Sequence, residues 1–247
     1  MGSLFEKWKK GLKKKVHPFC TAIVPAAGKS SRMGGEDKMF APLCGVPVLA
    51  RTLTVLDQAV LVDEIVVAAQ PEKLEEVAAL VSSAGIRKPV RVVEGGASRA
   101  ESVLLAALEA NEDVEYLAVH DGARPLVLPK QVDDLIRLGQ RTYAVAPAVP
   151  VTDTVKVADL SGLVLSTPDR STLFAVQTPQ VFQANLLKAA LQSAIAAEAP
   201  LTDDCSAVER LGKEVYLTPG WRENIKITTP EDLSVAEAFL RRRGDAQ

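Results

Sequence analysis

A short turn of small residues near the start of the chain has the composition of a phosphate-binding loop. An apolar run rich in β-branched residues at 21–25 predicts a strand, and an Ala-Ala-Gly turn at 26–28 follows it. Small side chains let backbone N–H groups approach phosphate oxygens closely, and two cations, Arg32 and Lys38, come next in the chain. These cations would stabilise negative charge that develops at a reacting phosphorus atom. An ordinary strand-to-helix turn is the alternative interpretation.

Two common phosphate loops do not match this turn. Gly28-Lys29-Ser30 looks like the end of a P-loop, but that motif needs glycine at position 23, which is isoleucine. The dinucleotide-binding pattern needs glycine at position 30, which is serine. The mismatches argue against a P-loop enzyme and against a dehydrogenase.

A second group of candidate residues follows the predicted strand at 116–120. Asp121 stands at the end of this strand, where a lone carboxylate can bind a hard cation such as Mg²⁺. Arg124 follows in the same turn and can grip a phosphate through two N–H groups. An Asp-Gly turn with Arg124 in a surface ion pair is the alternative. His120 faces the opposite side of the strand from Asp121, so we assign it to structure.

Two further segments suit a bound nucleotide or phosphate. After a Gly-Gly turn at 95–96, Ser98 has capping-box spacing to the following glutamate, and a helix N-terminus favours anions and polar ligand atoms. Ser102 lies one turn inside this helix, where it either meets a nucleobase or only supports the cap. Lys226 is predicted on a short strand between two isoleucines. It is merely exposed if they face inward, and it orients a substrate phosphate if it lines the cleft.

Strands and helices alternate along the chain after residue 20. This rhythm predicts a mainly parallel sheet covered by helices on both faces, with ligands at the carboxyl ends of the strands. The predicted strands cover residues 21–25, 64–69, 90–94, 116–120, 143–148, 174–177 and 215–218. The predicted helices cover residues 47–58, 71–84, 98–110 and 128–138, and a further helix opens at 229–232.

One segment, residues 149–170, breaks this rhythm. It predicts a hairpin with strands at 153–157 and 163–166 around a Ser-Gly turn. A protruding hairpin needs a surface to pack against, and a partner subunit would supply one. The expected organisation is a lysine-rich extension at 1–19, a single domain at 20–243 and an inserted arm at about 150–171.

Composition limits the partners and the compartment. The formal net charge is −2 and the pI is about 5.8, so no overall basic field favours nucleic acid. No apolar run is long enough for a membrane span and no signal-peptide pattern opens the chain. The lysine-rich start has two interpretations. It forms a basic amphipathic helix that touches anionic lipid or a partner, or it is a solvated extension; neither provides a stable membrane anchor. Three widely spaced cysteines indicate reduced thiols and a cytoplasmic protein.

Taken in order, the motifs resemble one family of nucleotidyltransferases, the 2-C-methyl-D-erythritol 4-phosphate cytidylyltransferases of non-mevalonate isoprenoid biosynthesis. The resemblance runs from about residue 21 to about residue 241, and it depends on the ordered set more than on any single motif. Its parts are Ala26-Ala27-Gly28, Arg32-Met33, Lys38, Gly95-Gly96, Arg99, Ser102, 120–125, 152–156, 177–180, Thr202-Asp203-Asp204 and Asn224-Ile225-Lys226.

The resemblance implies a fold, a reaction and an assembly. The fold is a Rossmann-like nucleotidyltransferase domain with a mostly parallel central sheet and a protruding β-hairpin arm. The reaction transfers CMP from CTP to a polyol phosphate, 2-C-methyl-D-erythritol 4-phosphate, releases pyrophosphate and uses Mg²⁺. The assembly is a homodimer in which the arm embraces the second subunit.

The resemblance also implies a role for each site residue. Arg32 and Lys38 would stabilise the transition state at the α-phosphorus. The residues implied around CTP are Ala26, Ala27, Gly28, Gly96, Ser102 and Asp121, with Asp121 also holding Mg²⁺. The residues implied around the acceptor are Lys226, Arg170, Thr154 and Arg124, with Thr154 and Arg170 reaching across the dimer interface.

Three positions depart from the family pattern, and two other activities stay open. Met39 stands in the place of a glutamine, Ala97 in the place of an acidic residue and Glu223 in the place of an aspartate. A ribitol-5-phosphate cytidylyltransferase, which makes CDP-ribitol, shares the loop, the turn after the aspartate and the arm. A catalytically inactive nucleotide-binding regulator is the other alternative.

Overall fold

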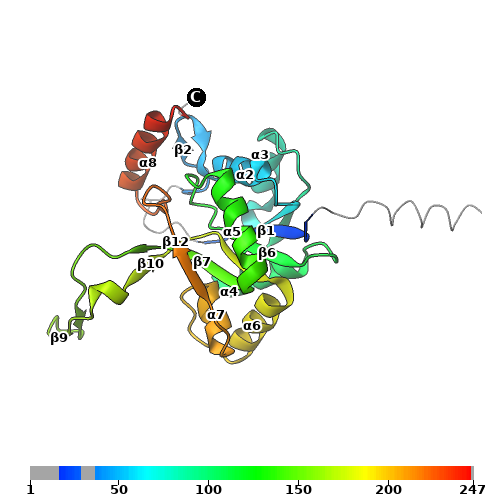
Figure 1. Cartoon of the computed structure of the whole chain (residues 1–247). Helices are drawn as coiled ribbons and strands as arrows, with labels where there is room; N and C mark the ends of the chain where they lie inside the picture. Colours follow the sequence, from blue (N-terminus) through cyan, green and yellow to red (C-terminus); the bar gives the residue numbers. More distant parts are fainter. Residues whose placement is uncertain (1–16, 29–36, 246–247) are drawn as a thin grey trace, which may run out of the picture.

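The computed structural model describes residues 17–28 and 37–245, and the central element of this part is an eight-stranded sheet (Figure 1). Its strands are β1 (Cys20–Pro25), β4 (Glu64–Ala69), β5 (Val90–Glu94), β6 (Tyr116–Val119), β7 (Ala144–Pro150), β10 (Phe174–Val176), β11 (Gln180–Gln183) and β12 (Tyr216–Pro219). The order is β10-β7-β11-β6-β1-β4-β5, and β12 pairs with β7. Strands β6, β1, β4 and β5 are parallel neighbours, whereas β10 and β11 run antiparallel to their neighbours.

Helices cover both faces of the sheet. They are α2 (Val48–Gln58), α3 (Leu74–Ser83), α4 (Arg99–Leu108), α5 (Pro129–Thr142), α6 (Ala184–Ala196), α7 (Asp204–Arg210) and α8 (Pro230–Arg243). Because side chains alternate across a strand, β1 sends Ala22 and Val24 into the core beneath α2, α3, α5 and α8. The next side chain, Ile23, enters a second core beneath α4, α6 and α7. The predicted fold class is therefore confirmed.

Several strands could be predicted from apolar runs in the sequence because the sheet is buried on both faces. Every residue of β4 is buried, and after Glu64 this strand is a continuous apolar run instead of an alternating one. The predicted strands at 21–25, 64–69, 90–94 and 116–120 match β1, β4, β5 and β6 within one residue. The three later predicted strands match β7, β10 and β12 with shifts of one or two residues at their ends.

The helix predictions hold with small corrections. The prediction at 71–84 divides into a 3₁₀ turn, η1 (Pro71–Lys73), followed by α3, and the prediction at 128–138 extends to Thr142 in α5. Strand β11 and helices α6 and α7 were not predicted. A small two-stranded sheet, β2 (Pro42–Leu43) with β3 (Val46–Pro47), was also not predicted.

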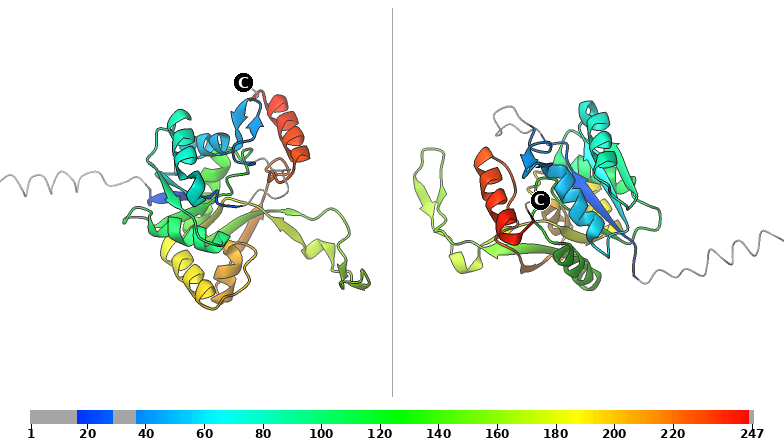
Figure 2. Two further views of the ribbon diagram at one scale, coloured as in Figure 1. Left: turned by 180° about the vertical axis from the view of Figure 1, so that it is seen from behind. Right: turned by 90° about the horizontal axis from the view of Figure 1, so that it is seen from above.

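The predicted hairpin is present as an arm that projects from the sheet (Figures 1 and 2). Its strands are β8 (Val157–Ala158) and β9 (Val164–Ser166), so the first strand is shorter and later than predicted. Gly162 adopts a φ of +88° in the turn, a conformation that glycine tolerates best. The arm carries several exposed apolar side chains, namely Val157, Leu160, Leu163, Val164 and Leu165.

Candidate active site

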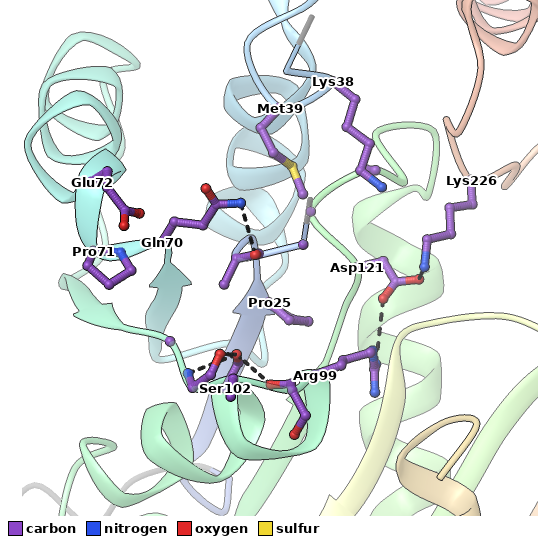
Figure 3. A pocket seen from close by; sticks show the side chains of 18 residues that line it. Pro25, Lys38, Met39, Gln70, Pro71, Glu72, Arg99, Ser102, Asp121 and Lys226 are labelled. Carbon is purple, nitrogen blue, oxygen red and sulfur yellow. Dashed lines mark hydrogen bonds and ion pairs between the residues drawn. The ribbon is translucent and has the colours of Figure 1, made fainter. Parts of the chain in front are cut away.

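A cavity of about 640 Å³ opens where β1, β4, β5 and β6 end, the edge at which α/β sheets bind ligands (Figure 3). The loop after each strand contributes to its lining. Ala27 and Gly28 follow β1, and Gly96 follows β5. Asp121 follows β6, and Lys226 reaches the cavity from the loop between β12 and α8. Residues far apart in the sequence therefore meet at this edge of the sheet.

Asp121 forms the charged centre of the cavity. The residue is only 7% exposed, and its Oδ2 lies 2.9 Å from the Lys226 ammonium and 3.4 Å from Nε of Arg124. Its Oδ1 lies 3.5 Å from the Arg99 guanidinium (Figure 3). Burial alone would raise the pKa of Asp121, but Arg99, Lys226 and Arg124 outweigh burial and hold that pKa well below its usual range. The aspartate is therefore a carboxylate at any physiological pH.

A buried hydrogen-bond relay fixes the backbone of Asp121. The Asp121 N–H donates to Oγ1 of Thr178 at 3.0 Å, and this hydroxyl lies 2.9 Å from Nδ1 of His120. The other ring nitrogen of His120 lies 3.0 Å from the carbonyl oxygen of Arg124. A carbonyl only accepts, so Nε2 carries the proton and Nδ1 accepts from the Thr178 hydroxyl. His120 is fully buried, and burial lowers its pKa to about 4, so the assignment of His120 to structure is confirmed.

Three loops are tied together beside this relay. The Arg124 guanidinium donates to the Asn224 carbonyl at 2.7 Å, and the Asn224 amide donates to the Thr178 carbonyl at 2.8 Å. The N–H of Ile227 donates to the carbonyl of Ala123 at 2.9 Å. These bonds place Lys226 against Asp121, so the lysine lines the cavity instead of being merely exposed. The predicted short strand around Lys226 was wrong, because residues 225–228 form a loop that pairs with no strand, and the Ile227 N–H bonds to the loop after β6.

The loop after β5 forms the opposite wall of the cavity. Ser98 caps α4, and the predicted capping box with Glu101 is present. The hydroxyl of Ser102 accepts from the Gly96 N–H at 3.1 Å and donates to the Ser98 carbonyl at 2.8 Å. A Cβ at Gly95 would lie 2.7 Å from the Cβ of Ala27, so glycine lets this loop pack directly on the loop after β1. Ser102 thus supports the cap and also lines the cavity.

The predicted phosphate loop is described in part. Ala27, Gly28 and Lys38 line the cavity, and Ala26 is buried. Arg32 lies outside the described residues.

The three residues that we expect to depart from the family pattern have different surroundings. Ala97 lines the cavity, and Met39 lines it while its sulfur packs beside Gly122. Glu223 is not in the lining, because its carboxylate accepts from Nε of Arg243 at 2.7 Å and also pairs with Arg242.

Two predicted acceptor residues, Thr154 and Arg170, lie on the arm and not in the cavity of their own chain. Both are exposed, and the Arg170 guanidinium donates to the Thr152 carbonyl at 2.7 Å at the base of the arm. The cavity thus gathers Lys38, Asp121, Arg124 and Lys226 in or beside one space, whereas Thr154 and Arg170 lie away from it.

A parallel-sheet edge with a small-residue loop and cations around one aspartate defines a phosphate-handling α/β protein of the nucleotidyltransferase class. The family model for IspD, 2-C-methyl-D-erythritol 4-phosphate cytidylyltransferase, matches residues 20–242. The chain therefore belongs to this family of nucleotidyltransferase enzymes, and the resemblance seen in the sequence is confirmed.

Relatives and solved structures agree with this assignment. The 2-C-methyl-D-erythritol 4-phosphate cytidylyltransferase of Bacillus cereus is 43% identical over 221 residues, which cover 89% of this chain and 97% of that protein. The enzyme of the same name from Desulforamulus reducens is 43% identical over 90% of this chain and 96% of its own. The crystal structure of 4-diphosphocytidyl-2C-methyl-D-erythritol synthase from Anaerococcus prevotii has a TM-score of 0.78 at 28% identity, covering 91% of this chain and 96% of that one. The Thermus thermophilus cytidylyltransferase has a TM-score of 0.73 at 30% identity, covering 90% and 99%.

Proposed function

We propose that this chain transfers CMP from CTP to 2-C-methyl-D-erythritol 4-phosphate and releases pyrophosphate, as a step of isoprenoid biosynthesis. The observation that carries this proposal is the convergence of Lys38, Lys226 and Asp121 on one cavity beside the loop after β1. The names of the relatives supply the nucleotide and the acceptor.

The reaction needs positioning and charge more than covalent chemistry. An oxygen of the acceptor phosphate attacks the α-phosphorus of CTP, the bond to the β-phosphate oxygen breaks, and pyrophosphate leaves with that electron pair. Lys38 lines the cavity and supplies positive charge to the phosphates, and we assign the same role to Arg32. The backbone at Gly28, which is exposed, and at Ala27, which is half-buried, receives the phosphates, and we assign the buried Ala26 to the same turn.

The nucleoside fits the wall formed by the loops after β1 and β5. Gly96 and Ser102 line this wall opposite Asp121, and the Ser98 helix cap orients it. The small side chains leave room for a flat base between the two loops.

The donor set at Asp121 suits Mg²⁺. A protein magnesium site typically offers one or two carboxylates and takes its other ligands from substrate phosphates and water. Asp121 lines the cavity as a carboxylate, and no cluster of three metal-ligating side chains occurs in residues 17–28 and 37–245. We infer that Asp121 would hold Mg²⁺ together with the triphosphate; the ion would neutralise phosphate charge.

The acceptor is assigned to Lys226 and Arg124 from one chain and to Thr154 and Arg170 from the arm of a second copy. The exposed apolar side chains of the arm support a homodimer, since a projecting hairpin is marginal on its own. No described helix is long and apolar enough to cross a membrane. We place the protein in the cytoplasm, where its cysteines stay reduced.

Measurement of pyrophosphate release with CTP and Mg²⁺ tests the proposal. We expect turnover with 2-C-methyl-D-erythritol 4-phosphate and little with ribitol 5-phosphate. Turnover with ribitol 5-phosphate alone would refute the assigned acceptor, and CTP binding without any turnover would favour the inactive regulator.

A further inference from the structure

Arg99 lies between two buried carboxylates. Its guanidinium is 2.7 Å from Oδ2 of Asp204 and 3.5 Å from Oδ1 of Asp121. Asp204 is the first residue of α7 and only 1% exposed, and Arg99 is the partner on which its carboxylate depends within the described part of the chain. The ion pair with Arg99 is therefore the main compensation for a buried charge.

Arg99 is held more closely by Asp204 than by Asp121, and this difference affects Oδ1 of Asp121. Arg99 makes its close contact with Asp204, and it stays farther from Asp121 than Lys226 does. Figure 3 shows Arg99 and Lys226 approaching the aspartate from different sides, with Arg99 at Oδ1 and Lys226 at Oδ2. A guanidinium that lost its second carboxylate would move onto Asp121, because charge-assisted pairs favour shorter contacts.

We propose that Asp204 is a positioning residue: it anchors Arg99 and thereby keeps Oδ1 of Asp121 available to a cation that arrives with the nucleotide. This inference rests on the proposed function. With Asp204 neutral, Arg99 competes with that cation for Asp121. The defect should therefore depend on Arg99 being present.

Asp203 provides a charge-matched control one residue away. It caps α7 through the Ser206 N–H at 2.9 Å and accepts from Gln180 at 2.8 Å, and asparagine also caps helices well. Asp203→Asn and Asp204→Asn thus remove the same charge from the same helix end, but only Asp204→Asn removes the close partner of Arg99.

The experiment is a double-mutant cycle read out by CTP binding. Calorimetry with CTP, with Mg²⁺ and with a chelator, gives the factor by which Mg²⁺ strengthens binding. We expect Asp204→Asn to reduce this factor about fivefold or more, and Asp203→Asn to change it less than about twofold. In an Arg99→Met chain, adding Asp204→Asn should change the factor less than about twofold, since no guanidinium is left to close on Asp121. Removing both members of a buried pair is also tolerated better than removing one.

Each other result contradicts the inference. An equal effect of Asp204→Asn with and without Arg99, or equal effects of the two asparagine variants, would reduce Asp204 to a structural role. If Asp204→Asn does not fold by circular dichroism, Asp204→Glu replaces it, with a smaller loss expected only when Arg99 is present. If the unaltered chain fails to bind CTP with Mg²⁺, the proposed function is overturned as well. If the unaltered chain turns over normally but Asp204→Asn has the same effect with and without Arg99, only the inference about Asp204 is overturned.

Discussion

Replacement of Thr178 by valine tests the hydrogen-bond relay behind Asp121 without altering the charged side chains around that aspartate. Valine keeps the shape of threonine but removes the hydroxyl that bonds both the Asp121 N–H and His120. Thr178 is buried, so the substitution leaves a donor and an acceptor without partners. Each buried orphan costs about 1–3 kcal/mol, and we expect the free energy of unfolding to fall by about 2–6 kcal/mol.

The same substitution should also slow the reaction. Asp121 would lose one of the bonds that fix its backbone, and small displacements of a catalytic group commonly cost about tenfold or more in kcat. Urea denaturation followed by circular dichroism measures the stability, and pyrophosphate release measures kcat.

Thr142→Val is the matched control. The Thr142 hydroxyl only donates to the Leu138 carbonyl within α5 at 3.1 Å, so its removal strands no second buried group. We expect Thr142→Val to change the unfolding free energy by less than about 1 kcal/mol, as for surface-type substitutions. Equal destabilisation by the two variants would refute the relay.

Three further predictions follow from the site. Burial lowers the pKa of His120 from 6.5 in the unfolded chain to about 4 in the folded one, so the unfolded chain binds the extra proton between these pH values. The free energy of unfolding should therefore fall by about 3 kcal/mol as the pH drops from 6.5 to 4. Urea midpoints across this range should depend more steeply on pH than they do in His120→Asn. Lys38→Ala should lower kcat at least about a hundredfold without changing the circular dichroism spectrum, and a near-normal kcat would contradict its role. Gly96→Ala places a Cβ against Glu101, so CTP affinity in calorimetry should fall about tenfold or more, and unchanged affinity would place the nucleoside elsewhere.

The parts of the fold that the sequence predicted are those with a strong local signal. Strands β1 and β4 are buried on both faces, and apart from Thr21 and Glu64 their residues are apolar. Helix α4 has a capping box that can be recognised in the sequence. Strand β11 has four residues and inserts antiparallel between β6 and β7, a pairing that no local pattern encodes. Helix α6 had a usable signal, since its leucines and alanines recur at helical spacing.

The candidate site also has a part that local sequence predicts and a part that depends on long-range contacts. Asp121 was predictable because polar residues at the ends of parallel strands collect at one edge of a sheet. The contact of Lys226 with Asp121 depends on Arg124 and Asn224 bonding across 100 positions of sequence. Such long-range bonds follow from the tertiary fold, and sequence spacing alone left the direction of the lysine open.

The local charge of the cavity runs opposite to the charge of the whole chain. The protein has a formal net charge of −2, but one lysine and two arginines, Lys226, Arg99 and Arg124, surround Asp121 at the carboxyl end of β6. The positive field is thus built from fixed positions: Arg124 is tied to the Asn224 carbonyl and Arg99 to Asp204. Cations held in place before the ligand arrives need little reorganisation when charge develops on a phosphate, which is the condition for electrostatic catalysis. In the part of the chain that the structure describes, this edge of the sheet therefore concentrates fixed positive charge where a phosphate would be attracted.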